Sequence, residues 1–137
     1  QWAKDNAALS GLKDAPIRYI VDDCFKFVER EIRRGNTYDA IIMDPPSYGR
    51  GPNGEVWKLE QQLSELLTDV GKIISDDPLF FFLNSYTGGL SPTILNYMVK
   101  SCIAPDKNGK VYTEEIGIKV TKRDVILPCG NTTIWTK

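Results

Sequence analysis

The run Asp44-Pro45-Pro46-Ser47-Tyr48 contains the residues of this sequence that are best suited to chemistry. Proline fixes φ and has no N–H, so the proline pair holds the Asp44 carboxylate and the Pro45 carbonyl in a fixed direction. Two fixed acceptors can hydrogen-bond an exocyclic amino group and keep its nitrogen in line for reaction. Tyr48 can stack on a base that has left its helix. The alternatives are an ordinary strand-end turn for Asp44 and a packed loop aromatic for Tyr48.

The elements that must position this run alternate between helix and strand. Short β-rich or apolar runs predict strands over 17–21, 38–43 and 79–83. Apolar residues at intervals of three and four predict helices around 2–9, 25–34, 56–74 and 91–102, with Ser91 as an N-cap. Two adjacent prolines and three glycines predict a loop over 44–54, and alternation predicts an antiparallel hairpin of 111–120 and 125–135.

This order of elements predicts an α/β fold with a mostly parallel sheet, helices on both faces and an antiparallel C-terminal hairpin. In such sheets, ligands bind beyond the carboxyl ends of the strands. The residues that follow the strands therefore carry the most information about function; they are 22–25, 44–48 and 84–89.

Two of these runs resemble motifs of the class I S-adenosylmethionine-dependent methyltransferases. The stretch YDAIIMDPPSYGRGPNGEVWKLE is similar to the bacterial large-subunit (23S) rRNA methyltransferases, which carry Asp-Pro-Pro-x-aromatic, and Asp22-Asp23-Cys24-Phe25 resembles the D-D-x-F run that ends their third strand. The resemblance covers nearly all of the 137 residues. It implies a partial Rossmann-like fold in which residues 1–137 form the C-terminal part of a single catalytic domain. The family's glycine-rich first motif and its ribose-binding acidic residue are absent from this chain, and the resemblance places them before Gln1.

The resemblance also implies roles for individual residues. The cofactor would be S-adenosylmethionine, with Asp23 accepting a hydrogen bond from the adenine amino group and the Cys24 N–H meeting the ring nitrogen. Phe25 would form an adenine wall, and Asp44 would lie between the cofactor and the target. The alternatives are a helix N-cap for Asp23 and a core position for Phe25. The sequence departs from the family at Ser47, where many enzymes that methylate amino groups have the aromatic residue.

The family's strand order, three-two-one-four-five-seven-six, leads to a further expectation about which strands this chain contains. This chain would hold strands three to seven, so that strand three, at 17–21, would have no neighbour. Strand four, at 38–43, would expose an apolar edge through which the isolated chain could self-associate.

The cysteine and histidine content limits the chemistry further. The three cysteines are far apart and there is no histidine, which argues against a disulfide framework, a catalytic triad and a histidine-based zinc site. These features favour a reducing cytoplasm and no metal. Methylation at carbon 5 of cytosine would need a cysteine in the loop NSYTGGLSP, which has none. We therefore expect transfer to a nitrogen, with a target that this chain does not specify as the alternative, and the resemblance implies a base of ribosomal RNA as the substrate.

Two other functions remain open from the residues alone. AIIMD looks like the magnesium-binding strand of a nucleotide hydrolase, but no GxxxxGK[ST] is present and two prolines follow the aspartate. A non-catalytic binding module on a Rossmann-like sheet is the other alternative. The net charge of −1 gives no general basic signature, and the basic clusters 30–34 and 119–123 are compatible with solvated faces. No apolar run is long enough to span a membrane.

Overall fold

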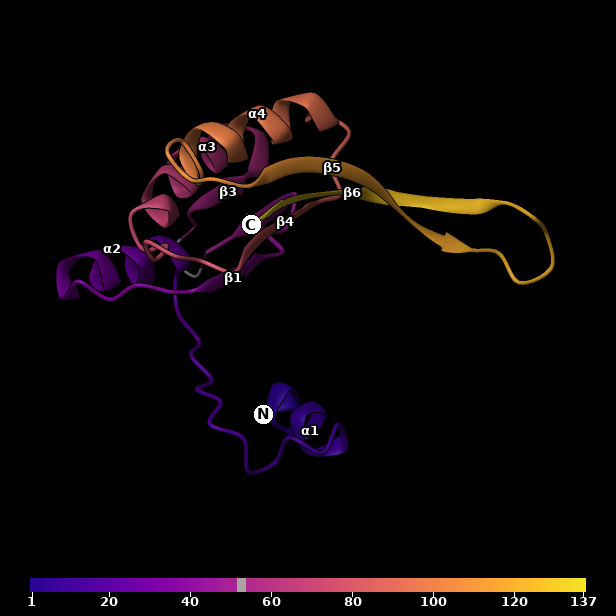
Figure 1. Cartoon of the computed structure of the whole chain (residues 1–137). Helices are drawn as coiled ribbons and strands as arrows, with labels where there is room; N and C mark the ends of the chain where they lie inside the picture. Colours follow the sequence, from indigo (N-terminus) through magenta and orange to yellow (C-terminus); the bar gives the residue numbers. More distant parts are fainter. Residues whose placement is uncertain (52–53) are drawn as a thin grey trace.

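A computed structural model describes residues 1–51 and 54–137 of the chain. Its centre is a four-stranded sheet in the order β1-β4-β6-β5 (Figure 1). The strands are β1 (Ala40–Met43), β4 (Phe80–Ser85), β5 (Lys110–Lys119) and β6 (Ile126–Thr136). β1 and β4 are parallel, whereas β6 is antiparallel to both β4 and β5. The α/β class and the C-terminal hairpin are confirmed, and the described sheet is mixed rather than mostly parallel.

The strand order agrees with the order that the sequence resemblance implied. If β1 is strand four of the family, then β4, β6 and β5 are strands five, seven and six. The run 17–21, expected to be strand three, is not a strand: it is extended and unpaired, and Val21 is fully exposed. A strand needs a neighbour to satisfy its backbone groups, and no described strand lies beside this segment.

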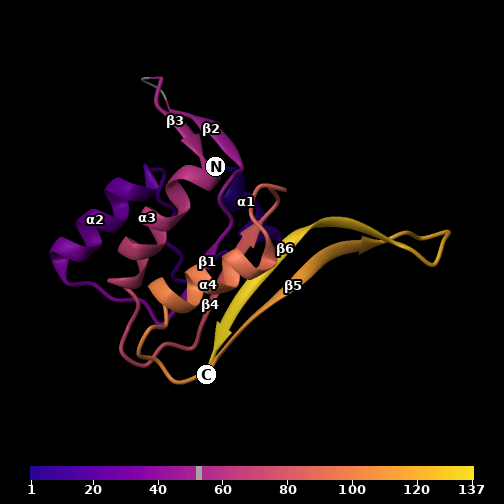
Figure 2. The same ribbon diagram turned by 90° about the horizontal axis from the view of Figure 1, so that it is seen from above.

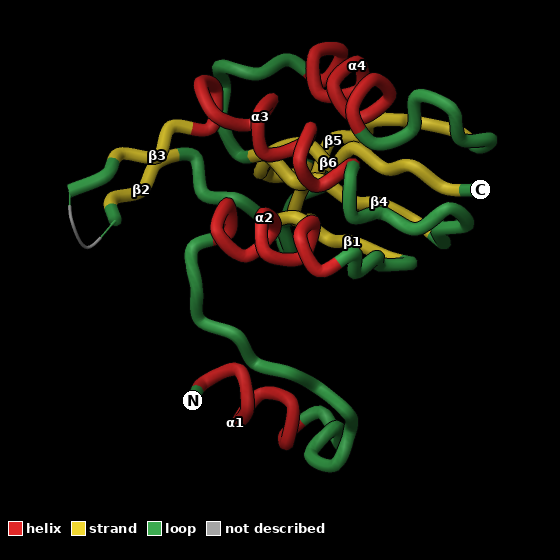
Figure 3. The backbone as a smooth tube through the Cα atoms, turned by 90° about the vertical axis from the view of Figure 1, so that its left-hand side faces the viewer, coloured by secondary structure: helices red, strands yellow, loops and turns green. Residues whose placement is uncertain are grey.

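Three helices pack against the sheet, and all three lie on the same face (Figures 2 and 3). They are α2 (Cys24–Arg34), α3 (Leu59–Gly71) and α4 (Pro92–Cys102). The prediction of helices on both faces was wrong for the described chain, because successive right-handed crossovers that advance across a sheet in one direction place their helices on one side. The remaining helix, α1 (Trp2–Leu9), lies apart from the sheet and buries no residue.

The core lies between the sheet and these three helices. Alternate residues of β4 are buried, because successive side chains of a strand point to opposite faces. The side chains that are almost completely buried include Leu59, Leu63, Leu67, Phe81, Leu83, Leu95, Val99 and Trp135. Ser91 caps α4 as predicted, since its hydroxyl accepts a hydrogen bond from the Ile94 N–H. The helical spacing in the sequence therefore identified the faces that form the core.

The predicted loop 44–54 contains more order than its prolines and glycines suggested. A two-stranded antiparallel hairpin joins β2 (Tyr48–Arg50) to β3 (Val56–Lys58). The helix predicted from residue 56 therefore starts at Leu59, after β3. Pro52 and Asn53 of the predicted loop lie outside the described residues.

The β5–β6 hairpin projects well beyond the rest of the sheet (Figure 1). Its outer part exposes several aliphatic side chains: Ile118, Val125, Ile126 and Leu127. Among the described residues, no helix is both long enough and apolar enough to cross a membrane.

Candidate active site at the carboxyl end of strand β1

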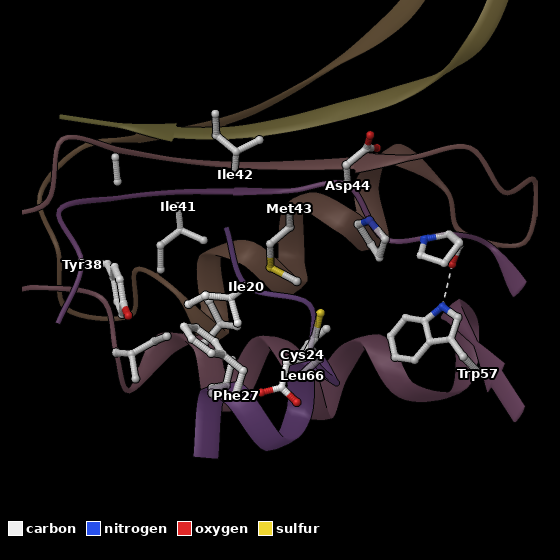
Figure 4. Close-up of a pocket in the computed structure, with 17 residues that line it drawn as sticks. Ile20, Cys24, Phe27, Tyr38, Ile41, Ile42, Met43, Asp44, Trp57 and Leu66 are labelled. Carbon is white, nitrogen blue, oxygen red and sulfur yellow. Dashed lines mark hydrogen bonds between the residues drawn. The ribbon is translucent and has the colours of Figure 1, made fainter. Parts of the chain in front are cut away.

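A cavity of about 570 Å³ lies between β1 and the layer formed by α2 and α3 (Figure 4). Asp22 and Cys24 line it from the segment that leads into α2, and Asp44, Pro45 and Pro46 line it from the end of β1. The rest of the lining is mainly apolar and includes Ile20, Phe27, Ile41, Met43 and Val70. A mostly apolar cavity with a few polar groups is typical of a small-molecule site. The fold therefore brings two of the sequence-predicted runs, 22–25 and 44–46, to one place.

Asp44 directly follows β1, and its side chain points away from the helix layer. Figure 4 shows Met43 pointing towards α2 and α3, whereas Ile42 and Asp44 point to the opposite side of the strand. This follows from the alternation of side chains along an extended backbone. The Asp44 carboxylate and Cys24 therefore lie on different sides of the carboxyl end of β1.

The second residue of the proline pair is held by a tryptophan. The Trp57 Nε1–H donates a hydrogen bond of 2.6 Å to the Pro46 carbonyl (Figure 4). Trp57 belongs to β3 and packs against Phe25, with ring centroids 6.0 Å apart. The sequence analysis did not single out Trp57, although it lies in the VWKLE run that carried part of the resemblance.

The two aspartates before α2 make different contacts. The Asp23 side chain caps α2 by accepting a hydrogen bond of 3.0 Å from the Lys26 N–H. The N-cap interpretation of Asp23 is confirmed, and its neighbour Asp22 is the residue that lines the cavity. Asp22 forms an ion pair with Arg30, and the hydrogen bond from Arg30 lowers the pKa of the Asp22 carboxyl.

Two of the aromatic residues proposed from the sequence lie outside the cavity wall. Phe25 is partly buried against the core and packs on Trp57, which favours the core interpretation. Tyr48 is half exposed on β2, where its hydroxyl accepts a hydrogen bond from Arg50 Nε. Tyr48 is therefore not among the residues that line the cavity next to Asp44.

A different tyrosine, Tyr86, directly follows β4 and lies at the same edge of the sheet as Asp44. The nearby Asp44 carboxylate is the main reason that the pKa of Tyr86 is raised. The only signal in the sequence was the position of Tyr86 after a strand. Its neighbour Thr87 donates a hydrogen bond to Glu60 at 2.7 Å and lowers the pKa of that carboxyl. The loop after β4 is thus tied to α3.

Metal-ligating side chains do not gather at this site. Within residues 1–51 and 54–137, no three His, Cys, Asp or Glu side chains are grouped so that they could hold a metal ion.

Comparison with known proteins gives close structural matches, although no family model matches the chain. The crystal structure of a SAM-dependent methyltransferase from Agrobacterium tumefaciens superposes with a TM-score of 0.87 and 36% sequence identity, covering 98% of this chain and 45% of that protein. A second methyltransferase, crystallised in complex with SAH, superposes with a TM-score of 0.70 at 16% identity, covering 96% of this chain and 35% of that protein. The second match shows the fold alone.

A curated relative points to the same group of proteins. Ribosomal RNA large subunit methyltransferase K from Neisseria meningitidis is 25% identical over 85 residues, which are 61% of this chain and 24% of that protein. The chain thus spans less than half of the Agrobacterium structure and about a quarter of the Neisseria protein. The chain is a homologue of the S-adenosylmethionine-dependent methyltransferases, and it has their class I fold.

Proposed function

We propose that this chain supplies the target side of the active site in an S-adenosylmethionine-dependent methyltransferase that acts on a base of ribosomal RNA. Residues 1–137 would be the C-terminal part of its single catalytic domain. The observation that carries the proposal is the position of Asp44-Pro45-Pro46 at the carboxyl end of β1, beside a mostly apolar cavity and in the class I fold. The name of the Neisseria relative supports ribosomal RNA as the substrate.

The proposed work of Asp44, Pro45 and Pro46 is orientation of the target amino group. Trp57 already holds the Pro46 carbonyl, so the proposed acceptors for the target are the Asp44 carboxylate and the Pro45 carbonyl. Proline at both positions limits backbone motion, so the acceptors keep their direction when the base arrives. S-adenosylmethionine supplies the methyl group from its sulfonium centre. Holding the accepting nitrogen in line with that group would account for most of the catalytic effect.

The proposed cofactor contacts lie around the start of α2. Asp22 and Cys24 line the cavity here, and apolar side chains such as Ile20 and Phe27 continue the lining. This combination suits a nucleoside, which has hydrogen-bonding edges and apolar faces. Asp23 would act mainly by capping the helix, which leaves Asp22 as the carboxylate nearest to the ligand. Phe25 would support this wall through Trp57.

Tyr48 is proposed to act outside the cavity. It stands half exposed on the β2–β3 hairpin, beside Arg50. An aromatic ring next to a guanidinium group can stack on an unpaired base and contact its phosphate. Tyr48 would then hold RNA next to the target rather than the target base itself.

Methyl transfer tests the proposal directly. The natural full-length protein is incubated with methyl-tritiated S-adenosylmethionine and an unmodified transcript of large-subunit rRNA, and the RNA is digested to nucleosides for chromatography and mass spectrometry. The expected result is label on an exocyclic nitrogen of a base. RNA binding without transfer would instead support the non-catalytic binding module, and label on ribose or on a ring carbon would contradict the proposed chemistry.

We also propose that the 137-residue chain, expressed alone, self-associates through β1. In the described sheet, β1 pairs with β4 and its other edge has no neighbouring strand. Ile42 at this edge is 64% exposed. An unpaired apolar edge offers hydrogen-bonding groups to another chain.

A further inference from the structure

The β5–β6 hairpin continues past the end of the sheet that carries the candidate site. β6 runs antiparallel to β4, and Ser85 at the carboxyl end of β4 lies opposite Asn131, which also pairs with Glu115 of β5. The hairpin residues between Glu115 and Asn131 therefore extend beyond β4. Asp44 emerges at the same end of the sheet, because it directly follows β1, which is parallel to β4. The outer part of the hairpin, residues 116–127, thus forms an arm on the side of the fold that carries Asp44.

The arm reaches well beyond the other elements of the fold (Figures 1 and 2). An antiparallel strand rises about 3.4 Å per residue, so the stretch from Glu115 to Thr121 spans about 20 Å. The register shifts between Ile116 and Gly117, where the arm leaves the sheet, and an irregularity of this kind bends and twists a hairpin. All residues of the arm except Ile116 and Val120 are exposed. The arm is therefore a two-stranded ribbon that the described fold leaves open on both faces.

The arm carries a net positive charge close to its turn. Lys119, Lys122 and Arg123 are exposed, and Asp124 is the one acidic residue between positions 116 and 127. Among the described residues, none of these three cations takes part in a salt bridge. The fold therefore does not use them to neutralise a carboxylate. Exposed cations of this kind can neutralise the phosphates of a nucleic acid and release its counterions.

Aliphatic side chains lie next to these cations on both strands of the arm. Ile118 pairs with Leu127, and Lys119 pairs with Ile126, and all four side chains are exposed. Unpaired RNA offers apolar base faces and riboses between its phosphates, so it can contact an apolar strip and the cations beside it at the same time. A protein partner would account for the aliphatic strip but not for unpaired cations at the turn. Charge complementarity therefore favours RNA.

We propose that the arm binds the RNA substrate outside the cavity, with Lys122 and Arg123 contacting phosphates and the aliphatic strip contacting unpaired nucleotides. The inference rests on the proposed function and adds to it a surface that holds the substrate. It also gives a role to the basic cluster 119–123, which the sequence alone left compatible with a solvated face. The turn of the arm lies far from Asp44, so the arm should affect the binding of RNA and not the transfer step.

RNA binding at several salt concentrations tests the arm. The natural full-length protein is titrated against a radiolabelled transcript of large-subunit rRNA in a filter-binding assay. The double variant Lys122→Gln/Arg123→Gln should raise the Kd about tenfold at about 0.15 M salt, and it should reduce the slope of log K against log salt by about 1.4. The control is Lys100→Gln/Lys110→Gln, which removes the same charge at two exposed positions near the base of the hairpin. Its Kd should stay within about twofold of the wild-type value.

Kinetics separate a binding role from a catalytic one. With tritiated S-adenosylmethionine and the same transcript, Lys122→Gln/Arg123→Gln should raise the KM for RNA and leave kcat and the cofactor Kd unchanged. If this variant binds and methylates RNA like the control while the wild-type protein is active, the inference is wrong and the proposed function stands. If the wild-type protein neither binds nor methylates the transcript, both are wrong.

A protein surface is the competing occupant of the arm. The variant Ile126→Ser/Leu127→Ser removes the aliphatic strip on both faces of β6. If it changed the oligomeric state in light scattering while Lys122→Gln/Arg123→Gln kept the wild-type Kd for RNA, the arm would be a protein contact and the inference would be overturned. Weaker RNA binding by both variants, with an unchanged oligomeric state, is the expected result.

Discussion

The Trp57 indole nitrogen and the Pro46 carbonyl oxygen are joined by a hydrogen bond of 2.6 Å. Trp57 lies on β3 and packs on Phe25 of α2, so this bond connects the proline pair with two separate elements. The rigidity of Asp44-Pro45-Pro46 thus has two sources: the restricted φ of proline and a side chain that arrives from 11 residues later in the sequence.

Trp57→Phe should separate these two sources. Phenylalanine keeps the apolar packing and loses the N–H, so the free energy of unfolding should fall by about 1 kcal/mol. Methyl transfer should fall more than stability does, because the Pro46 carbonyl loses its anchor. Urea unfolding and the transfer assay measure the two effects. Trp2→Phe on the exposed helix α1 is the control, and equal behaviour of the two variants would show that the bond is unimportant.

Asp23 should matter for stability through its cap. Asp23→Ala removes the hydrogen bond to Lys26 and should cost about 1 kcal/mol of unfolding free energy. Asp23→Asn retains a capping oxygen and should cost much less. Thermal unfolding and calorimetric titration with S-adenosylmethionine are made on both variants. If Asp23→Asn abolished cofactor binding while keeping stability, the carboxylate itself would be a ligand for the adenine.

Glu31 should make stability depend on acid pH. Its carboxylate accepts hydrogen bonds from Tyr38, Asn36 and Arg34, which hold the pKa of Glu31 at about 2, below its usual value of 4.5. Because the folded pKa is the lower one, this stabilisation is complete above pH 4.5 and is lost as the pH falls towards 2. Glu31→Gln should therefore lose stability at neutral pH and flatten the pH dependence below 4.5.

The control for this prediction is Glu29→Gln, an exposed position on the same helix. Urea unfolding at a series of pH values compares the two variants. A Glu31→Gln protein with the same acid profile as the wild type would contradict the role given to this cluster.

The open edge of β1 should make the chain 1–137 associate when it is expressed alone. Light scattering is expected to show oligomers or aggregates, and Ile42→Lys at the exposed edge should reduce their size, because edge charges oppose strand pairing. Leu12→Lys, at a half-exposed position outside the sheet, serves as the control. A stable monomer of unmodified 1–137 would show that this edge does not attract a second chain.

Sequence reasoning succeeded where a pattern is local. The spacing of Leu59, Leu63, Leu66 and Leu67 identified α3 and its buried face, and Ser91-Pro92 identified the start of α4. The motif Asp44-Pro45-Pro46 directly follows β1, where the pattern of the sequence placed it. Each of these features depends on residues within one or two turns or on one strand.

Sequence reasoning failed where the local structure depends on a residue that is distant in the sequence. Residues 17–21 have the composition of a strand but no partner, and β2 and β3 pair across glycines that looked like loop. The contacts of Pro46 with Trp57 and of Glu60 with Thr87 join residues from different elements. Their existence depends on sheet order and register, which no short window of the sequence contains.

The role of Asp44 can be measured most directly with two alanine variants of the same strand region. Asp44→Ala and Asp39→Ala lie at opposite ends of β1, and Asp39 is exposed. In the natural protein, Asp44→Ala should lower kcat for rRNA methylation at least a hundredfold while the dissociation constant of S-adenosylmethionine stays within about twofold, as expected for a residue that acts on the target. Asp39→Ala should match the wild type in both. Full activity of Asp44→Ala, or loss of cofactor binding equal to its loss of rate, would contradict the account.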